Sequence, residues 1–374
     1  MRHQLFSLAL LASAGTVWAQ PPADEVAKLG IEGTEYTPLG AIRAASADGK
    51  VPEWTPYTPN GDKLIREARW VTDRYGDEQP LFTVTKANMA EYADMLSEGH
   101  KRMLDRYDTY KMNVYPSHRD AAWPKEIYEA TIANASKATL EDGDPDKLRA
   151  ATLGFPFPIP TSGAHPWWNH RLKWRGEHVK RYNNQAIVQD DGSYQLTKIV
   201  EEVSFYYANI ANPGTMNTAD DIFLKYLSTT TAPPRIAGQL LLAWEHADYR
   251  SAWLYNPGLR RIRRAPSVGY DNPYEGTDGQ QFYDQVDMIN GKLDRYNWKL
   301  IGRKVMITPY NSERINSNEL KYDQILKGRH IEQDLARYEM HRMWIVEANN
   351  KPDVRHTFKK LSLIHISEPT RPLY

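Results

Sequence analysis

Cysteine is absent from the 374 residues of this chain. The chain therefore forms no disulfide and carries no lipidated cysteine of the kind that anchors a bacterial lipoprotein. Long apolar runs are missing too, because the longest, residues 5–14, is about half of the roughly twenty residues that a membrane-spanning helix needs. The charges balance, with 47 basic and 47 acidic residues. This balance argues against a nucleic-acid footprint and against an anionic-membrane footprint.

The N-terminus has the three parts of a secretion signal. Arg2 supplies the positive charge, residues 5–14 supply the apolar segment, and Val17-Trp18-Ala19 supplies the cleavage pattern of small residues before Gln20. We therefore interpret residues 1–19 as a cleavable signal peptide. The mature chain is expected in a bacterial periplasm, exported, soluble and without a lipid anchor.

The C-terminus departs from the pattern of the rest. Residues 361–371, LSLIHISEPTR, resemble the translation of an adapter used in preparing sequencing libraries. We interpret residues 361–374 as adapter-derived and residues 20–360 as a single, C-terminally truncated domain. Residues 361–374 are then expected to pack poorly. A strand expected at 354–360 would be left with an unpaired edge.

The first half of the mature chain predicts an arm followed by helices. Residues 20–80 are rich in Pro, Gly and small residues, which predicts an extended arm held by anchors such as Trp54 and Tyr57. Apolar residues at helical spacing predict one helix over 85–110, N-capped by Thr85, and a shorter one after Pro124. Alternating prolines in residues 154–160 predict an extended strap.

From residue 171 onward the pattern has the period of two that is typical of strands. Hairpin sequences at 190–193 and 256–258 indicate antiparallel pairing, because such short links cannot form parallel crossovers. The predicted fold is α+β, a large curved antiparallel sheet, or half-barrel, with helices against its concave face. The strands are expected at 171–179, 185–189, 194–207, 222–231, 236–246, 251–255, 260–264, 298–307, 340–347 and 354–360.

Several of these strands carry apolar residues at alternate positions. One interpretation is a plain core beneath the helices, and the other is an apolar ligand cavity lined by this face of the curved sheet. The residues that would line such a ligand site are Phe205, Tyr207, Leu240, Leu242, Trp244, Trp253 and Tyr255.

Signals for catalysis, metals and cofactors are weak. His165 and His170 are five residues apart with a proline between them, a spacing that does not place two ligands on one helical face. The chain has no nucleophile elbow, phosphate loop or dinucleotide fingerprint, so we expect neither a cofactor nor a metal. The densest charge cluster, residues 260–264, has four arginines. It fits a solvated hairpin, or a contact with an acidic partner or lipid head groups.

Several sequence blocks point to a known family. They are residues 39–41, 48–54, 154–158, 167–169, 255–266, 270–273, 281–284, 296–298 and 344–348. The chain resembles the bacterial family known as domain of unknown function 1329 (DUF1329). This resemblance implies a relationship to the lipoprotein-sorting (LolA/LolB-like) proteins, whose half-barrel encloses a lipid-accommodating cavity. It supplies no catalytic residues.

Three functional hypotheses follow. The leading one is a periplasmic carrier or binding protein for a lipid or acyl chain, accessory to an inner-membrane transporter of the resistance-nodulation-division type. A hydrolase acting on an envelope lipid or polysaccharide would instead need a convergent cluster of ionisable side chains. The third hypothesis is a structural interaction module.

The signal-peptide interpretation predicts the N-terminus of the exported protein. Expression in a Gram-negative host should yield a periplasmic protein that begins at Gln20, because the peptidase cleaves after Ala19. N-terminal sequencing of the periplasmic fraction checks this. Recovery there of a chain that retains Met1 would contradict the interpretation.

Overall fold

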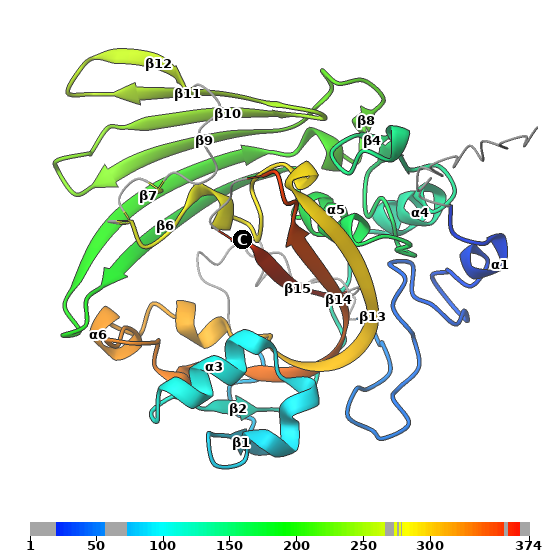
Figure 1. Ribbon diagram of the computed structural model, residues 1–374, viewed down its shortest axis with the longest axis horizontal. Helices are drawn as coiled ribbons and strands as arrows, with labels where there is room; N and C mark the ends of the chain where they lie inside the picture. The colour runs from blue at the N-terminus through cyan, green and yellow to red at the C-terminus, as the bar shows by residue number, and fades with distance from the viewer. Residues whose placement is uncertain are drawn as a thin grey trace, which may run out of the picture.

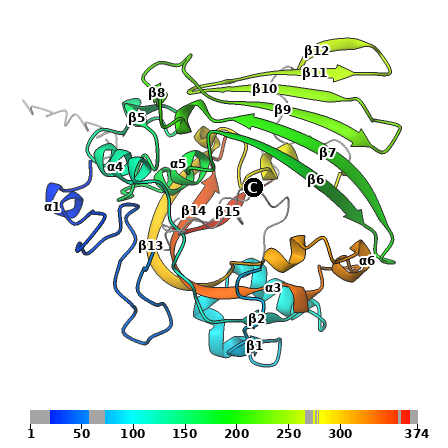
Figure 2. The same ribbon diagram turned by 180° about the vertical axis from the view of Figure 1, so that it is seen from behind.

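The structure is a computed structural model that describes residues 20–56, 73–265, 273–274, 277, 279–354 and 358–366. Two large sheets dominate it, one formed by the middle of the chain and the other mainly by the C-terminal part (Figure 1; Figure 2 shows the reverse side). Helices lie beside and below them. The predicted α+β class with antiparallel sheets is confirmed. The predicted Tyr57 anchor lies outside the described residues.

The first sheet has six strands in the order β12-β11-β10-β9-β7-β6, and every neighbouring pair is antiparallel. Both predicted hairpins are present, since residues 190–193 join β6 to β7 and residues 257–260 join β11 to β12. The strands are β6 (His178–Val188), β7 (Tyr194–Ser204), β9 (Ile222–Ala232), β10 (Leu240–His246), β11 (Arg250–Asn256) and β12 (Arg261–Ala265).

The second sheet has five strands, so the expected single sheet is divided in two. Its ladders are antiparallel except for one parallel pair, Tyr338 with Val114, which joins β14 to β2. The order is β1-β2-β14-β13, with β15 also paired to β14. The strands are β1 (Phe82–Val84), β2 (Met112–Val114), β13 (Tyr296–Pro309), β14 (Tyr338–Asn350) and β15 (Lys360–Ile366).

The helix expected over 85–110 is broken into two. A 3-10 helix η1 (Met89–Met95) is followed by α3 (Glu98–Arg106), whose N-cap Ser97 accepts a hydrogen bond from the His100 amide at 3.2 Å. The N-cap is therefore Ser97 and not the predicted Thr85, because the Ser97 hydroxyl accepts a hydrogen bond from an amide of the first turn. The predicted apolar stripe still packs against the second sheet, in a cluster with Leu104 and Met112.

The predicted helix after Pro124 is confirmed as α4 (Lys125–Asn134). The strand expected at 171–179 is wrong, since the chain there leaves helix α5 (Ala164–Leu172) and enters β6 only at His178. No helix of the described ranges is both long and apolar enough to cross a membrane. The remaining elements are α1 (Ala23–Val26), β3 (Thr139–Leu140), η2 (Glu141–Gly143), β4 (Leu148–Arg149), β5 (Ala151–Thr152), η3 (Tyr206–Ala208), β8 (Thr215–Met216), η4 (Tyr283–Gln285), η5 (Leu293–Arg295), η6 (Glu313–Asn316), α6 (Tyr322–Ile325) and η7 (Gln333–Leu335).

The strap of residues 154–160 is buried although it has no regular structure. Side-chain amides replace the missing backbone partners, as a buried peptide requires. Asn169 of α5 accepts from the Phe157 amide at 2.9 Å and donates to the Phe157 carbonyl at 2.7 Å. Asn134 of α4 donates to the carbonyls of Leu153 and Phe155. The two helices thus fix the course of the strap.

The described part of the N-terminal arm has little regular structure apart from the short helix α1, and a buried arginine holds it in place. Arg119 donates to the carbonyl oxygens of Ile42, Arg43 and Pro52, at 2.7, 3.1 and 2.6 Å. Trp54 is buried and meets Tyr128 of α4 edge-on, with ring centroids 6.1 Å apart.

The last described segment differs from expectation. Residues 360–366 form β15, which pairs with residues 343–349 of β14. Leu361 and Leu363 are half-buried and pack against the core cluster that contains Trp168. The expectation of poor packing is therefore wrong for Leu361 and Leu363, and residues 367–374 lie outside the described part. The strand expected at 354–360 is likewise displaced, because β15 begins at Lys360.

Two glycines of the arm give a matched test of its packing. Gly40 and Gly49 both have positive φ, +82° and +71°, but a Cβ on Gly40 would lie 1.8 Å from the Pro158 carbonyl oxygen, whereas a Cβ on Gly49 would meet nothing within 4 Å. Gly49→Ala should lower the free energy of unfolding by about 1 kcal/mol, the cost of a left-handed alanine. Gly40→Ala should cost clearly more than Gly49→Ala, because the arm must also move off the strap. Urea unfolding measures both variants, and equal losses would contradict this packing.

Candidate functional site

Five of the seven predicted ligand-binding residues lie on one face of the six-stranded sheet. The β10–β11 register places Leu240 opposite Tyr255 and Leu242 opposite Trp253, with Trp244 two residues further along β10. Opposite residues of neighbouring strands share a face, and alternate residues of one strand do so too. The alternation in the sequence therefore predicted that these five side chains lie on one face, and the strand register agrees.

Strand β9 extends the same face. Leu227 lies opposite Leu242, and Lys225 lies opposite Trp244. The rings of Trp244 and Trp253 meet edge-on with centroids 5.3 Å apart, and the Lys225 ammonium lies 4.4 Å from the centre of the Trp244 ring. We call this set the outer aromatic face. It consists of Leu227, Leu240, Leu242, Trp244, Trp253 and Tyr255.

The outer aromatic face is turned away from the protein interior. None of its members belongs to the four clusters of buried hydrophobic residues found in the described part of the chain. Leu227 is 36% exposed, and the flanking Tyr182 of β6 and Ile262 of β12, on the same face, are 60% and 70% exposed. Among the described residues, this face is therefore not part of the core beneath the helices.

Phe205 and Tyr207 do not join this face. The register of β7 places Val203 opposite Tyr226, on the other side of the sheet, and β7 ends at Ser204. The Tyr207 side chain is buried in the core cluster of α5, and its hydroxyl donates to the Gly154 carbonyl at 3.0 Å. Sequence alternation failed here because the strand stops before Phe205 and a 3-10 turn, η3, redirects the chain.

The inner face of the sheet carries charged pairs instead. Arg171 of α5 meets Glu245 of β10 at 3.1 Å, and both residues are 9% exposed. Arg250 of β11 also bonds Glu245 and reaches Asn290. This face therefore looks toward α5 and the segment around residue 290.

A second ionic group lies at the end of α5. The Asp287 carboxylate bonds His170 and Arg175, each at 3.0 Å. Burial opposes the ionisation of Asp287, but the His170 hydrogen bond and the Arg175 charge hold its pKa well below the usual value. Burial lowers the pKa of Lys173 to about 8, and the positive charge of Arg175 acts in the same direction. Asp287 and Met288 have φ values of +52° and +74°, so these contacts hold a strained backbone.

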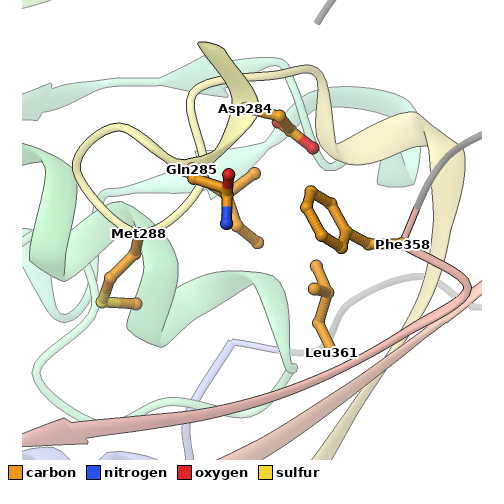
Figure 3. A pocket seen from close by; sticks show the side chains of 6 residues that line it. Asp284, Gln285, Met288, Phe358 and Leu361 are labelled. Atoms are coloured by element: carbon orange, nitrogen blue, oxygen red, sulfur yellow. The ribbon is translucent and has the colours of Figure 1, made fainter. Parts of the chain in front are cut away.

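A pocket of about 280 Å³ adjoins this strained turn (Figure 3). In the figure, Asp284, Gln285 and Met288 project from one wall, and Phe358 and Leu361 from the other. Ile289 completes the lining, and none of the seven predicted residues takes part. The volume is below the roughly 300–1,000 Å³ of typical ligand sites, so this pocket is too small to enclose a lipid.

Helix α5 was missed in the sequence although it organises both ionic groups. Eight of its nine residues are buried, and a helix buried on all sides has no polar stripe to reveal its period. Pro166 stands in its first turn, where proline is tolerated. His165 stacks on Phe157 at 3.8 Å and accepts from the Thr161 amide at 3.1 Å. Within the described ranges, no three His, Asp or Glu side chains are grouped so that they could hold a metal ion.

Comparison with known proteins identifies the family. The model of a family described as "Protein of unknown function (DUF1329)" matches residues 83–366. The chain belongs to this family. An uncharacterized protein of Pseudomonas aeruginosa is 42% identical over 370 residues, which cover 97% of this chain and 79% of that protein. The predicted family resemblance is therefore confirmed.

Two solved structures resemble parts of this DUF1329 chain. A DUF1329 family protein from Desulfovibrio piger matches with a TM-score of 0.30 and 12% identity, over 50% of this chain and 60% of that one. A putative outer membrane lipoprotein-sorting protein domain from Vibrio parahaemolyticus matches with a TM-score of 0.33 and 14% identity, over 56% of this chain and 68% of that one.

The buried His165 predicts a pH dependence of stability. Burial lowers its pKa to about 3, whereas an unfolded histidine titrates near 6.5. The folded chain keeps this ring neutral, so its contribution to stability is complete above pH 6.5 and is lost as the pH falls from 6.5 toward 3. Relative to His165→Gln, the parent should lose about 1.4 kcal/mol per pH unit in that window. Urea unfolding at pH 8, 6 and 5 measures the difference, and parallel pH profiles would contradict it.

Proposed function

We propose that this chain is a periplasmic binding protein for an amphiphile with an acyl chain, and that the acyl chain lies on the outer aromatic face. The observation that carries the proposal is the grouping of Leu240, Leu242, Trp244, Trp253 and Tyr255 on a face that the protein's own core does not use. Large exposed apolar patches on a folded protein are binding sites far more often than accidents.

The arrangement of the face suits an extended chain. Leu227, Leu242 and Trp253 form a row across three neighbouring strands, and Leu240 with Tyr255 forms the next row. An acyl chain crossing these rows would replace water over both. Such burial contributes about 0.8 kcal/mol for each methylene group, so a chain of ordinary length gains enough to offset the loss of its freedom.

The charges at the border favour an anionic head group. Lys225 lies over the Trp244 ring at one end of the rows and forms no ion pair with a carboxylate of the described residues. The nearby carboxylate of Glu202 on the same face is already paired with Lys180 at 3.0 Å. A carboxylate or phosphate head group could therefore pair with the Lys225 ammonium, which no carboxylate of the described residues occupies.

The periplasmic location rests on the signal-peptide interpretation of residues 1–19, and a transporter partner of the resistance-nodulation-division type stays a hypothesis. The geometry gives less support to a hydrolase. The ionisable side chains next to the inner face are paired, since Glu245 bonds Arg171 and Arg250 and, at the end of α5, Asp287 bonds Arg175. Such mutual pairing is typical of a structural network, whereas catalysis needs a group poised to exchange a proton.

Substitutions on the outer aromatic face test the proposal. Leu242→Asp and Trp244→Asp should each weaken binding of a fluorescent fatty acid at least tenfold, because a carboxylate would sit where the acyl chain binds and would repel its head group. Both side chains are only half-buried, so the free energy of unfolding should fall by no more than about 1 kcal/mol. Fluorescence titration and urea unfolding measure the two effects.

Leu81→Asp is the matched control, because Leu81 is 60% exposed and directly precedes β1 of the other sheet. It should leave the affinity for the fatty acid unchanged. Unaltered affinity in both face variants, or no binding by the parent chain, would overturn the proposal.

A further inference from the structure

The hairpin that joins β11 to β12 exposes aliphatic and cationic side chains together. Leu259, at its tip, is 54% exposed and Ile262 is 70% exposed. Four arginines surround them, and all four are exposed. They are Arg260, Arg261, Arg263 and Arg264. Strand β12 is also the last strand of the six-stranded sheet, so its far edge pairs with no other strand of the described residues.

Within the part of the chain that the structure describes, the arginines of this hairpin have no carboxylate partners. None of the four forms an ion pair with a carboxylate of the described residues, although basic side chains elsewhere in that part commonly do. Like charges packed this closely repel one another, and only side-chain extension into water relieves the repulsion. Among the described residues the cluster therefore has no compensating negative charge, and an anionic surface would supply one.

The tip has a defined shape. The Asn256 side-chain oxygen accepts hydrogen bonds from the amides of Gly258, at 2.9 Å, and Leu259, at 3.3 Å. Arg260 then adopts φ of +49°, in the left-handed region. This turn closes the hairpin so that Leu259 stands at its end, with Ile262 set back on β12 opposite Tyr255.

We propose that this hairpin docks onto the surface of a bilayer that contains anionic phospholipids. In that position Leu259 and Ile262 enter the interface and the arginines bind phosphate groups. Basic residues next to exposed aliphatic or aromatic side chains are the combination that holds peripheral proteins at such an interface. The inference goes beyond the proposed ligand site, because a dissolved amphiphile can reach the outer aromatic face without any membrane.

The distribution of charge around the hairpin favours a bilayer over an acidic protein. Along β12 the side chains alternate, so Arg261 and Arg263 project from one face and Ile262 and Arg264 from the other. A folded acidic partner would cover only one face. The side chains of the other face, either Arg261 and Arg263 or Ile262 and Arg264, would then make no contact with it. A layer of lipid head groups entered by the tip contacts both faces together.

The chain's balanced charge does not oppose this docking. The numbers of acidic and basic residues are equal over the whole sequence, but four of the 47 basic residues stand within five positions at this tip. Electrostatic attraction to a membrane falls off within a Debye length, about 8 Å at physiological salt, so the local charge decides.

Vesicle sedimentation tests the proposal. The parent chain should bind vesicles of phosphatidylcholine mixed equally with phosphatidylglycerol, and should bind pure phosphatidylcholine weakly. The quadruple variant R260Q/R261Q/R263Q/R264Q should lose roughly fivefold in partition coefficient for each arginine, several hundredfold in all. L259S/I262S should reduce binding at both low and high salt, because its contribution is apolar and is not screened.

The matched control removes equal charge from exposed sites elsewhere, in R102Q/K137Q/K292Q/K304Q, and should retain most of the binding. Equal losses in the two quadruple variants would overturn the docking site. The proposal would also be overturned if the parent chain bound vesicles equally well with and without phosphatidylglycerol. The same holds if the quadruple arginine variant lost affinity for polyglutamate but not for vesicles. Leu242→Asp, which is expected to lose the fatty acid, should still bind the vesicles, so failure of one proposal can be told from failure of the other.

Discussion

The ion pair between Arg171 and Glu245 decides which side of the six-stranded sheet faces outward. Both residues are 9% exposed, and they join α5 to the C-terminal end of β10. A buried charge without its partner costs several kcal/mol, so the sheet cannot turn its other face to α5 without losing this contact. Because side chains alternate along a strand, fixing Glu245 inward also fixes Trp244 outward.

The rest of the outer aromatic face depends on that choice. Leu242 and Leu240 point outward because they alternate with Trp244 along β10. Trp253 of β11 and Leu227 of β9 point outward because they lie opposite Leu242. On the inner face, Glu245 is paired with Arg171 and Arg250, and Arg250 also bonds Asn290. These contacts compensate the buried charges of that face. The inner contacts hold the sheet in place, so Trp244 and Trp253 can remain on the outer face. If these side chains formed the core, they could not be available to a ligand.

The sequence predicted the local part of this arrangement and not its direction. Alternation placed Leu240, Leu242 and Trp244 together, and hairpin residues placed Trp253 and Tyr255 beside them, because both signals act between neighbours. Which face is outward depends on Arg171, in a helix that burial on all sides made invisible. Tyr207 was misplaced for the same kind of reason, since its hydroxyl bonds the strap at Gly154, a contact distant in sequence. The division into two sheets also rests on contacts distant in sequence.

The arginines of β12 have a second physical role that agrees with their position. An open edge strand invites pairing with another chain, and charged side chains along it prevent such pairing. This role explains Arg261 and Arg263, but it does not explain why Leu259 and Ile262 stand exposed among them, because aliphatic side chains on an edge promote the association that the charges suppress. An edge designed only to stay unpaired would be polar throughout. The mixture of exposed aliphatic and cationic groups is therefore better accounted for by an anionic, partly apolar surface that meets this tip.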